Sequence, residues 1–277
     1  MITPKTALIT GATSGIGLAL AHELGKRGYS LVLTGLDPEA SHLIAEELAN
    51  QYKIQTKYVA MNLEDPESPQ RLFMGLEQMG TTIDVLVNNA GFGKLGKFWE
   101  SSIEAQLSMV SVNIEAVLRL TQLFLPRMLH RQNGRILMTA SVAGFVPGPN
   151  LAVYHATKAF LLSFSEALAT ELEGTGVTVT ALCPGATDTD FFLNAGMLET
   201  EIFQKGSLAK PEEVASAAID GLLKGSRVVV PGALNKTMVF SRRFLSEKAL
   251  AKSNKKAYQK VSPNDVRKIQ IKSRKRK

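Results

Sequence analysis

Three polar residues in the second half of the chain have types and a spacing suited to proton transfer. Tyr154 and Lys158 are four residues apart, so they would share one face of a helix. A free tyrosine has a pKa of about 10, and a nearby ammonium lowers it by stabilising the phenolate. Tyr154 could then act as an acid or a base nearer neutral pH. Ser141 follows an apolar run, where its hydroxyl can point into a crevice.

A glycine-rich turn near the N-terminus has the pattern of a phosphate-binding loop. It lies between an apolar run and a helical pattern, and it reads Thr10-Gly11-Ala12-Thr13-Ser14-Gly15-Ile16-Gly17. The three glycines allow a tight turn and a close approach of the backbone to a diphosphate, and the following helix offers free N–H groups. The turn therefore predicts nucleotide binding, with a plain strand-to-helix turn as the alternative.

The elements that must position these residues alternate between strands and helices. We expect strands at 5–10, 31–34, 56–61, 83–87, 135–139, 177–182 and 228–230. We expect helices at 15–28, 39–52, 69–79, 103–131 (bent near Pro126), 153–173 and 212–224. The strands are apolar without alternation, as in a parallel sheet buried on both faces. Residues 188–207 interrupt the alternation, where a mobile lid would sit.

This pattern predicts a single doubly wound, Rossmann-type α/β domain with a parallel sheet of about seven strands. The domain would span residues 1–235, and residues 236–277 would form a basic C-terminal extension. The net charge supports this division. Residues 1–235 hold 17 Lys and Arg against 23 Asp and Glu, whereas residues 236–277 hold 15 against 2.

The motifs, in this order, resemble those of the short-chain dehydrogenase/reductase family, and more loosely its bacterial broad-substrate carbonyl reductases. They cover residues 5–231 and comprise the Gly-x-x-x-Gly-x-Gly spacing at 11–17, Asn88-Asn89-Ala90-Gly91, Asn113, Ser141, Tyr154-x-x-x-Lys158 and Pro184-Gly185. The resemblance implies hydride transfer between a nicotinamide and a ketone, aldehyde or secondary alcohol, with Tyr154 as acid or base. It also implies that Ser141 holds the substrate oxygen, that Lys158 binds the nicotinamide ribose, and that Asn113 supports a water-linked proton path.

Two other functions remain open at this point. A nucleotide-binding scaffold or sensor without turnover would be marked by loss of Ser141, Tyr154 or Lys158, and all three are present. A carbon–carbon double-bond reductase usually alters the Ser–Tyr spacing, which here is 13, as in carbonyl reductases of the family. No metal is expected, since the four histidines are scattered. We interpret His155 as a packing or surface residue and Cys183 as a buried, inert thiol.

The choice between NADP and NAD rests on the end of the second strand. Gly35 stands where the family's NAD-selecting acid usually falls, and Leu36 where an NADP-selecting arginine often follows. Asp37 is expected to cap a helix. Nothing at Gly35 repels a 2′-phosphate, and Thr13 could bind one, so the sequence weakly favours NADP over NAD. The other residues expected at the cofactor are Asn62 and Leu63 at the adenine, Asn89, Ala90 and Gly91, and Pro184, Gly185, Thr187 and Thr189 near the nicotinamide.

The remaining expectations concern substrate, assembly and location. An apolar pocket for a small carbonyl or alcohol substrate is expected from Phe92, Phe145, Val146, Phe191, Phe192 and Met197. The resemblance implies a homodimer or homotetramer through the helices 103–131 and 153–173. One cysteine and the lack of a spanning apolar stretch favour the cytoplasm. The basic extension is interpreted as a solvated tail. Peripheral contact with an anionic membrane is the next alternative, and specific nucleic-acid binding is not expected.

Overall fold

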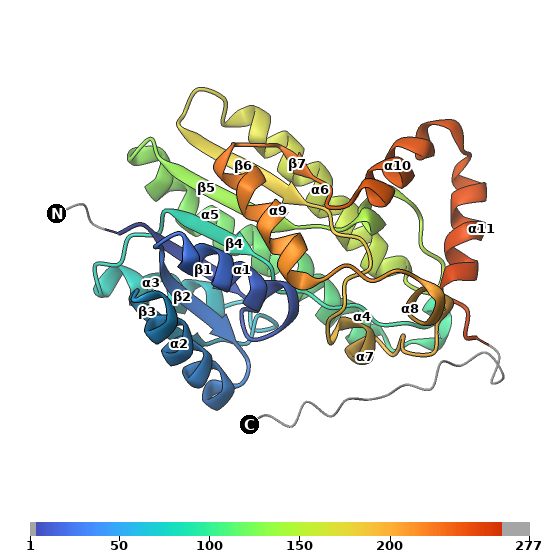
Figure 1. Cartoon of the computed structure of the whole chain (residues 1–277), viewed down its shortest axis with the longest axis horizontal. Coiled ribbons are helices and arrows are strands. Elements are labelled where there is room, and N and C mark those ends of the chain that lie inside the picture. Colours follow the sequence, from blue (N-terminus) through green and yellow to red (C-terminus); the bar gives the residue numbers. More distant parts are fainter. Residues whose placement is uncertain (1–3, 262–277) are drawn as a thin grey trace.

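The computed structural model describes residues 4–261 and shows a parallel sheet between two layers of helices (Figure 1). The seven strands lie in the order β3-β2-β1-β4-β5-β6-β7, and every neighbouring pair is parallel. Their bounds are β1 (Thr6–Thr10), β2 (Ser30–Gly35), β3 (Thr56–Ala60), β4 (Val85–Asn88), β5 (Gly134–Thr139), β6 (Val177–Leu182) and β7 (Val228–Val229). The predicted doubly wound sheet is confirmed.

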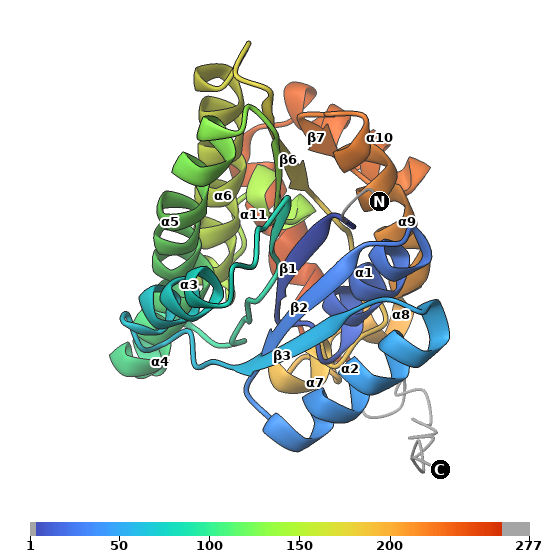
Figure 2. The ribbon, with the colours of Figure 1, turned by 90° about the vertical axis from the view of Figure 1, so that its left-hand side faces the viewer.

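Helices cover both faces of the sheet (Figure 2). One layer holds α1 (Gly15–Lys26), α2 (Pro38–Tyr52) and α9 (Pro211–Leu223), and the other holds α3 (Ser68–Gln78), α5 (Ala116–His130) and α6 (Ala152–Glu171). Each layer closes its own apolar cluster against the sheet. Central strands bury both faces, so their side chains are apolar without alternation. All six residues of β2 are buried, for example.

The chain reverses its direction of travel across the sheet at β1. From β1 it moves outward to β2 and β3, then crosses back to β4 on the other side of β1. The loops that follow β1 and β4 therefore leave the sheet in opposite directions and open a crevice at the carboxyl ends of the strands. Ligands of doubly wound proteins bind at this switch point.

The long helix expected at 103–131 is interrupted at Ser111–Glu115, ahead of Pro126. The segment contains α4 (Ile103–Val110), a π-helical turn at Ser111–Glu115, and α5, which continues through Pro126. The irregular turn contains Asn113, whose buried side chain makes hydrogen bonds outside the helix. The hydrogen bonding of this amide, rather than the proline, coincides with the departure from regular helix.

Two segments lie outside the strand–helix alternation. The predicted interruption between β6 and α9 holds the short helices α7 (Phe191–Asn194) and α8 (Glu201–Lys205). After β7 the chain forms α10 (Ala233–Ser241) and α11 (Glu247–Ala257), and α11 lies beside α8 (Figure 1). Among residues 4–261, no helix is both long and apolar enough to cross a bilayer.

The C-terminal extension packs on the body through a different part than its sequence indicates. The apolar residues Phe240, Phe244 and Leu245 are all exposed. Leu250 and Tyr258, from the highly charged stretch that follows, are buried instead. Tyr258 joins a small apolar cluster with Leu151, Phe192, Ala195 and Met197. The predicted boundary at residue 235 therefore falls inside α10, and both α10 and α11 contact the body.

Candidate active site

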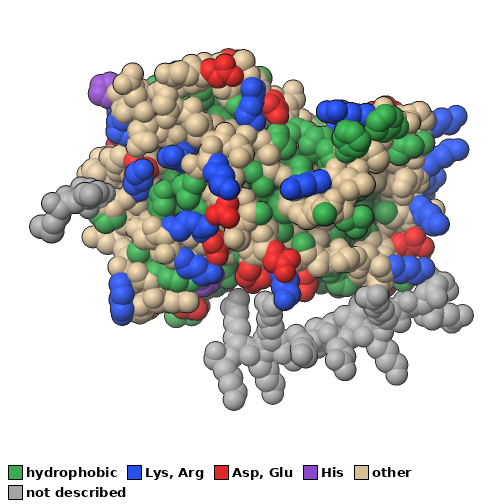
Figure 3. All heavy atoms as spheres, turned by 45° about the horizontal axis from the view of Figure 1, so that its top comes forward, with side chains coloured by type: hydrophobic (Ala, Val, Ile, Leu, Met, Phe, Trp, Pro, Cys, Tyr) green, Lys and Arg blue, Asp and Glu red, His purple; other side chains and the backbone are tan. Residues whose placement is uncertain are grey.

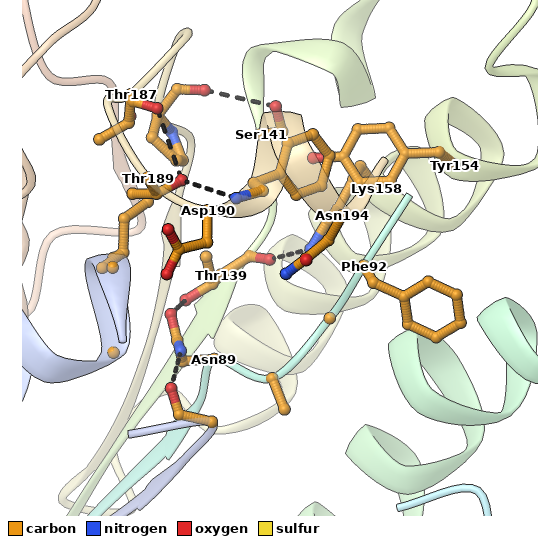
Figure 4. A pocket seen from close by; sticks show the side chains of 18 of the residues that line it. Asn89, Phe92, Thr139, Ser141, Tyr154, Lys158, Thr187, Thr189, Asp190 and Asn194 are labelled. Atoms are coloured by element: carbon orange, nitrogen blue, oxygen red, sulfur yellow. Dashed lines mark hydrogen bonds between the residues drawn. The ribbon is translucent and has the colours of Figure 1, made fainter. Parts of the chain in front are cut away.

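A cleft of about 530 Å³ runs across the carboxyl ends of the strands, from the glycine-rich turn to the C-terminal extension. Figure 4 shows a central part of it, where side chains from the loops after β4, β5 and β6 face those of α6. Every residue predicted for catalysis or cofactor binding lines this cleft except Asn113, which lies behind it. The predicted motifs, distant in sequence, are thus brought together at the switch point.

The glycine-rich turn after β1 is closely packed against the loop after β4. Gly11 has a φ of +62°, and a Cβ at Gly17 would lie 1.9 Å from the Gly11 carbonyl oxygen. The Asn89 side-chain amide donates to the carbonyls of Thr10 and Gly11, each at 3.1 Å. The turn therefore has room for backbone only. Such a cradle, at a helix N-terminus whose first N–H groups lack intrahelical partners, fits a dinucleotide phosphate.

The end of the cleft beside β2 carries no side-chain charge positioned to choose between NAD and NADP. Leu36 is 74% exposed on the cleft wall, and the Cβ of a larger residue at Gly35 would lie 2.6 Å from Thr13 Cγ2. Asp37 accepts a hydrogen bond from Ala40 N–H at 3.1 Å and caps α2, as predicted. Asn62 Oδ1, expected at the adenine, already accepts one hydrogen bond from the Glu64 N–H at 3.0 Å.

Ser141, Tyr154 and Lys158 meet where β5 ends beside the first turns of α6 (Figure 4). Ser141 Oγ accepts from Ala143 N–H at 3.1 Å and donates to the Pro184 carbonyl at 3.3 Å. Lys158 Nζ donates to the Thr139 carbonyl at 2.7 Å and lies 5.7 Å from the centre of the Tyr154 ring. Backbone carbonyls of two neighbouring strand ends thus fix the hydroxyl and the ammonium beside one phenol.

Burial dominates the acid–base properties of this group. It raises the pKa of Tyr154 to about 12, against the opposing effect of a hydrogen bond from Ser141. Burial also lowers the pKa of Lys158 to about 8. The effect expected of Lys158 on the Tyr154 phenolate is thus outweighed, and the phenol holds its proton at neutral pH. A neutral phenol is the form that can donate a proton to a carbonyl oxygen.

Asn113 supports the cleft from behind. It is fully buried, and its Oδ1 accepts from Phe92 N–H at 3.0 Å while its Nδ2 donates to the Phe92 carbonyl at 2.9 Å. The same Nδ2 lies 3.0 Å from Thr157 Oγ1 on α6. A Cβ at Gly91 would meet both Asn113 Oδ1 and Lys158 Nζ, at 3.0 and 3.3 Å. Asn113 therefore ties the loop after β4 to the helix that carries Tyr154.

The loop after β6 forms the opposite wall. Thr187 Oγ1 donates to the Gly185 carbonyl at 3.0 Å, and Thr189 Oγ1 donates to the Thr187 carbonyl at 3.5 Å (Figure 4). Cys183 follows β6 directly and is a free, buried thiol. Burial raises its pKa to about 12. Cys183 is buried, as predicted, and its raised pKa is the opposite of the lowered pKa that a reactive cysteine requires.

Apolar side chains line the part of the cleft beyond Tyr154. Five of the six predicted residues contribute, namely Phe92, Val146, Phe191, Phe192 and Met197. Phe145 does not line the cleft, because its ring packs beneath the Arg242 guanidinium, 5.5 Å from ring centre to Cζ. Met238, Asn254 and Tyr258 of the extension, which the sequence does not predict for the site, also line the cleft. The one signal for Tyr258 was an aromatic residue in an otherwise polar, basic stretch.

Comparisons with known proteins agree with this geometry. A family model described as short chain dehydrogenase matches residues 5–194. The chain is 36% identical over 222 residues to the 3-oxoacyl-[acyl-carrier-protein] reductase FabG of Aquifex aeolicus, covering 78% of this chain and 88% of that protein. A short-chain dehydrogenase from Sphingobium yanoikuyae in complex with NADPH matches with a TM-score of 0.78 and 30% identity, over 87% of this chain and 94% of that one. A short-chain dehydrogenase/reductase from Burkholderia phymatum in complex with NAD also has a TM-score of 0.78, with 26% identity over 87% of this chain and 93% of that one.

Proposed function

The chain belongs to the short-chain dehydrogenase/reductase family, and from this membership we propose that it interconverts a ketone or aldehyde and the corresponding alcohol with NAD(P), using Tyr154 as the acid or base. The observation that supports this most is the convergence of Ser141, Tyr154 and Lys158 on one cleft with a cradle for a dinucleotide phosphate. The nicotinamide supplies or accepts the hydride. The chain's own residues bind, orient and move the proton.

The proton steps follow from the hydrogen bonds of the site. In the direction of reduction, the Tyr154 hydroxyl donates its proton to the carbonyl oxygen. The Ser141 hydroxyl, which donates to the Pro184 carbonyl in this structure, turns to donate a hydrogen bond to the same substrate oxygen. Lys158, charged below a pKa of about 8, stabilises the phenolate left on Tyr154. In the direction of oxidation, the phenolate takes the proton of the alcohol. The apolar wall of Phe191 and Phe192 excludes water from the reacting carbon.

The experiment that tests this proposal is oxidation of NADPH and of NADH over a panel of ketones, aldehydes and 3-oxoacyl thioesters. Tyr154→Phe keeps the ring and removes the hydroxyl. It should bind cofactor normally while turnover falls by about 10²–10⁴-fold, the usual effect of losing an acid–base group. Near-normal turnover in Tyr154→Phe would remove this residue from the mechanism. A protein that binds cofactor but reduces nothing in the panel would favour the scaffold or sensor.

For the cofactor, we propose binding of either dinucleotide with a weak preference for NADP. The cradle after β1 accommodates the phosphates common to both. Leu36 supplies no arginine for a 2′-phosphate, and Gly35 supplies no carboxylate to repel one. Thr13 Oγ1, which faces Gly35, is the hydroxyl available to the phosphate.

For assembly, we propose a homodimer or homotetramer through the outer faces of α5 and α6. Leu118, Leu123 and Leu125 of α5 and Phe164 of α6 line a shallow apolar groove between these helices and α3. Phe160 stacks on Phe164 with ring centres 5.9 Å apart and is partly exposed beside the groove. A second copy of the chain would remove this apolar surface from water.

We also propose that the basic extension binds an anionic phospholipid surface. The contact would form on α10 and the 3-10 turn Arg242–Phe244, whose exposed side chains we call the basic apolar face. Its members are Leu234, Lys236, Met238, Phe240, Arg242, Arg243, Phe244 and Leu245. Figure 3 shows apolar and basic side chains side by side on this part of the surface.

Two properties of this face favour lipid. None of the nine residues of α10 is buried, and a helix that short is marginal in water unless its apolar side is covered. Phe240 and Phe244 lie edge to face on the surface, with Arg243 over the Phe240 ring. Residues 233–261 hold eight Lys and Arg against one acid. Exposed aromatic rings between cations are typical of helices that lie in a lipid interface.

Co-sedimentation with phosphatidylserine-containing vesicles tests the contact. Phe240→Ser/Phe244→Ser should pellet much less than wild type, whereas Trp99→Ser/Ile103→Ser, which changes an exposed apolar patch elsewhere, should pellet normally. High salt should weaken the binding. A variant truncated before Lys268, in the part of the chain outside the described residues, separates the contribution of those C-terminal charges to vesicle binding from that of the basic apolar face. Equal pelleting of the first variant and wild type, or binding to RNA alone, would overturn the proposal.

A further inference from the structure

Residues 259–261 of the C-terminal extension are hydrogen-bonded to the insertion between β6 and α9, beside the substrate part of the cleft. The N–H of Val261 donates to the Glu199 carbonyl at 2.8 Å, and the N–H of Glu201 donates to the Gln259 carbonyl at 2.9 Å. These bonds join residues 259–261 to the insertion that carries α8. The segment just before them, which ends α11, lines the cleft with Asn254 and Tyr258. A region that reads as a basic tail therefore forms a wall of the proposed substrate site.

Tyr258 is held in place by the residue that follows Tyr154. Its side chain is 9% exposed, and its hydroxyl lies 2.8 Å from His155 Nε2. The His155 ring centre is 6.1 Å from that of Tyr154 and 5.7 Å from that of Tyr258. A single imidazole thus separates the phenol at the reacting centre from the phenol on the far wall.

The direction of this hydrogen bond follows from the other ring nitrogen. His155 Nδ1 lies 2.7 Å from the Val146 carbonyl oxygen, which can only accept, so Nδ1 carries the proton. Burial lowers the pKa of His155, so the ring is neutral at neutral pH and Nε2 is an acceptor. The Tyr258 hydroxyl must therefore donate to Nε2. Its oxygen keeps its lone pairs and has no proton left to donate.

Asn254 is constrained in the same way. One atom of its side-chain amide lies 2.8 Å from the Pro147 carbonyl oxygen, so this atom is the NH₂ group. The amide oxygen is then the atom left for other partners. No residue between 4 and 261 donates a hydrogen bond to Asn254 Oδ1 or to Tyr258 Oη. Tyr258 Oη and Asn254 Oδ1 are thus two hydrogen-bond acceptors on side chains that line one wall. The O–H and NH₂ groups of the same side chains already donate to His155 and Pro147.

We propose that Tyr258 and Asn254 form a hydrogen-bond-accepting subsite that recognises a hydroxyl group carried by the substrate away from its reacting carbon. The proposal rests on the carbonyl reductase function proposed above and names its substrate class, a hydroxylated apolar ketone or the matching diol. His155 is a positioning residue that fixes the orientation of the Tyr258 hydroxyl.

The chemistry of the wall disfavours substituents that carry no hydrogen-bond donor. The oxygens of a carboxylate or a carbonyl would repel the two acceptor oxygens. Such a group would also give up its hydrogen bonds to water and gain none from the protein. A purely alkyl group gains nothing from the two oxygens and leaves them without partners. A hydroxyl donates to either oxygen, and its carbon chain lies against Phe192 and Met197 of the adjoining apolar cluster.

The test compares a series of methyl ketones of increasing chain length, each with and without a terminal hydroxyl. In the wild type, kcat/KM should favour the hydroxylated member at the matching length by about ten-fold, the effect of one well-placed hydrogen bond. Tyr258→Phe should bring this ratio close to one, mainly by raising KM for the hydroxylated ketone. The kcat for the plain ketone and the affinity for NADPH should stay unchanged.

A matched control exists on the other side of the sheet. Tyr52 makes the same kind of bond, with its hydroxyl 3.0 Å from His22 Nδ1, away from the cleft. Tyr52→Phe should leave the ratio of kcat/KM unchanged. Thermal unfolding of both variants shows whether either loses its fold, and Asn254→Ala gives a second measurement should Tyr258→Phe be unstable.

The outcomes separate this inference from the proposed function. Preference for the hydroxylated ketone that disappears in Tyr258→Phe but not in Tyr52→Phe supports the subsite. An unchanged ratio in Tyr258→Phe, or an equal loss of kcat for both ketones, overturns it and leaves Tyr258 a packing residue. A wild-type protein that reduces none of these ketones and no aldehyde contradicts the proposed function itself.

Discussion

At the scale of single residues, the charge of Lys158 governs how the proposed reaction should depend on pH. Its pKa is lowered to about 8 by burial, so the ammonium loses its proton as the pH rises through that value. We expect kcat/KM for carbonyl reduction to fall over the same range, because the Tyr154 phenolate loses its counter-charge. The measurement is a pH profile of NADPH oxidation, and a flat profile through pH 8 would contradict the assignment.

The same lowered pKa has a consequence for stability, with a definite sign. Between about 8 and the ordinary value of 10.5, the unfolded chain binds the Lys158 proton and the folded chain does not. The contribution of this lysine therefore makes the free energy of unfolding rise with pH in that window. The opposite contribution of Tyr154 begins only above its ordinary pKa of 10.0, because its folded pKa is raised to about 12.

Cofactor choice is also decided by single side chains, at the end of β2. Leu36→Arg should shift the ratio of affinities toward NADPH, because an exposed guanidinium here can pair with the 2′-phosphate. Leu36→Asp should shift it toward NADH. Gly35→Asp is a poorer test, since its Cβ would lie 2.6 Å from Thr13. If titration shows the same ratio in wild type and both Leu36 variants, this residue does not face the ribose.

The residues of the site differ in how far the sequence could predict them. Tyr154 and Lys158 were predictable because their relation is local, four positions on one helix. Asn113 was placed by resemblance, but its bonds to Phe92 span 21 residues and depend on a turn that the helical pattern hides. Phe145 was misplaced because an apolar residue in a loop carries no mark of which way its ring turns.

At the scale of elements, the cofactor cradle depends on the fit between β1, α1 and the loop after β4. A Cβ at Gly17 would lie 1.9 Å from the Gly11 carbonyl oxygen, so Gly17→Ala must displace α1 from the turn. We expect Gly17→Ala to lose most of its affinity for NADPH, together with about 1–3 kcal/mol of stability from overpacking. Gly75→Ala in α3 is the matched control, because nothing lies within 4 Å of its added Cβ. Normal binding by Gly17→Ala would mean that the turn can open without loss.

The positions of most elements followed from the sequence because parallel strands buried on both faces have uniformly apolar sequences. The packing of the extension on the body could not be predicted from the sequence. The basic composition of α11 indicates a solvated helix, yet Leu250 and Tyr258 bury one narrow face of it. Two apolar residues among many charges give too weak a periodic signal to reveal that face. Its partners, α8 and the loop after η3 (Val142–Phe145), lie some 40–110 positions earlier in the chain, as the bonds to Glu199 and Pro147 show.

At the scale of the whole molecule, two of the exposed apolar surfaces, the groove of α5 and α6 and the basic apolar face, predict different partners. The groove of α5 and α6 has little net charge nearby, since Arg119 is paired with Glu115 on the same helix. Among residues 4–261, no carboxylate forms an ion pair with Lys236, Arg242 or Arg243 of the basic apolar face. We therefore expect the groove to bind a second copy of the chain and the basic apolar face to remain available in that dimer.

Light scattering on two variants tests this assignment. Phe160→Glu/Phe164→Glu places charges in the groove and should reduce the particle to the mass of one chain at micromolar concentration, because burying an unpaired carboxylate is costly. Phe240→Ser/Phe244→Ser should leave the mass of the wild-type oligomer unchanged. The proposed catalytic residues Tyr154 and Lys158 line the cleft, and Phe160 and Phe164 do not, so a folded monomer should still bind NADPH. A wild type that is already monomeric would contradict the dimer, whereas dissociation by the second variant alone would place the interface on α10 and remove the argument for lipid.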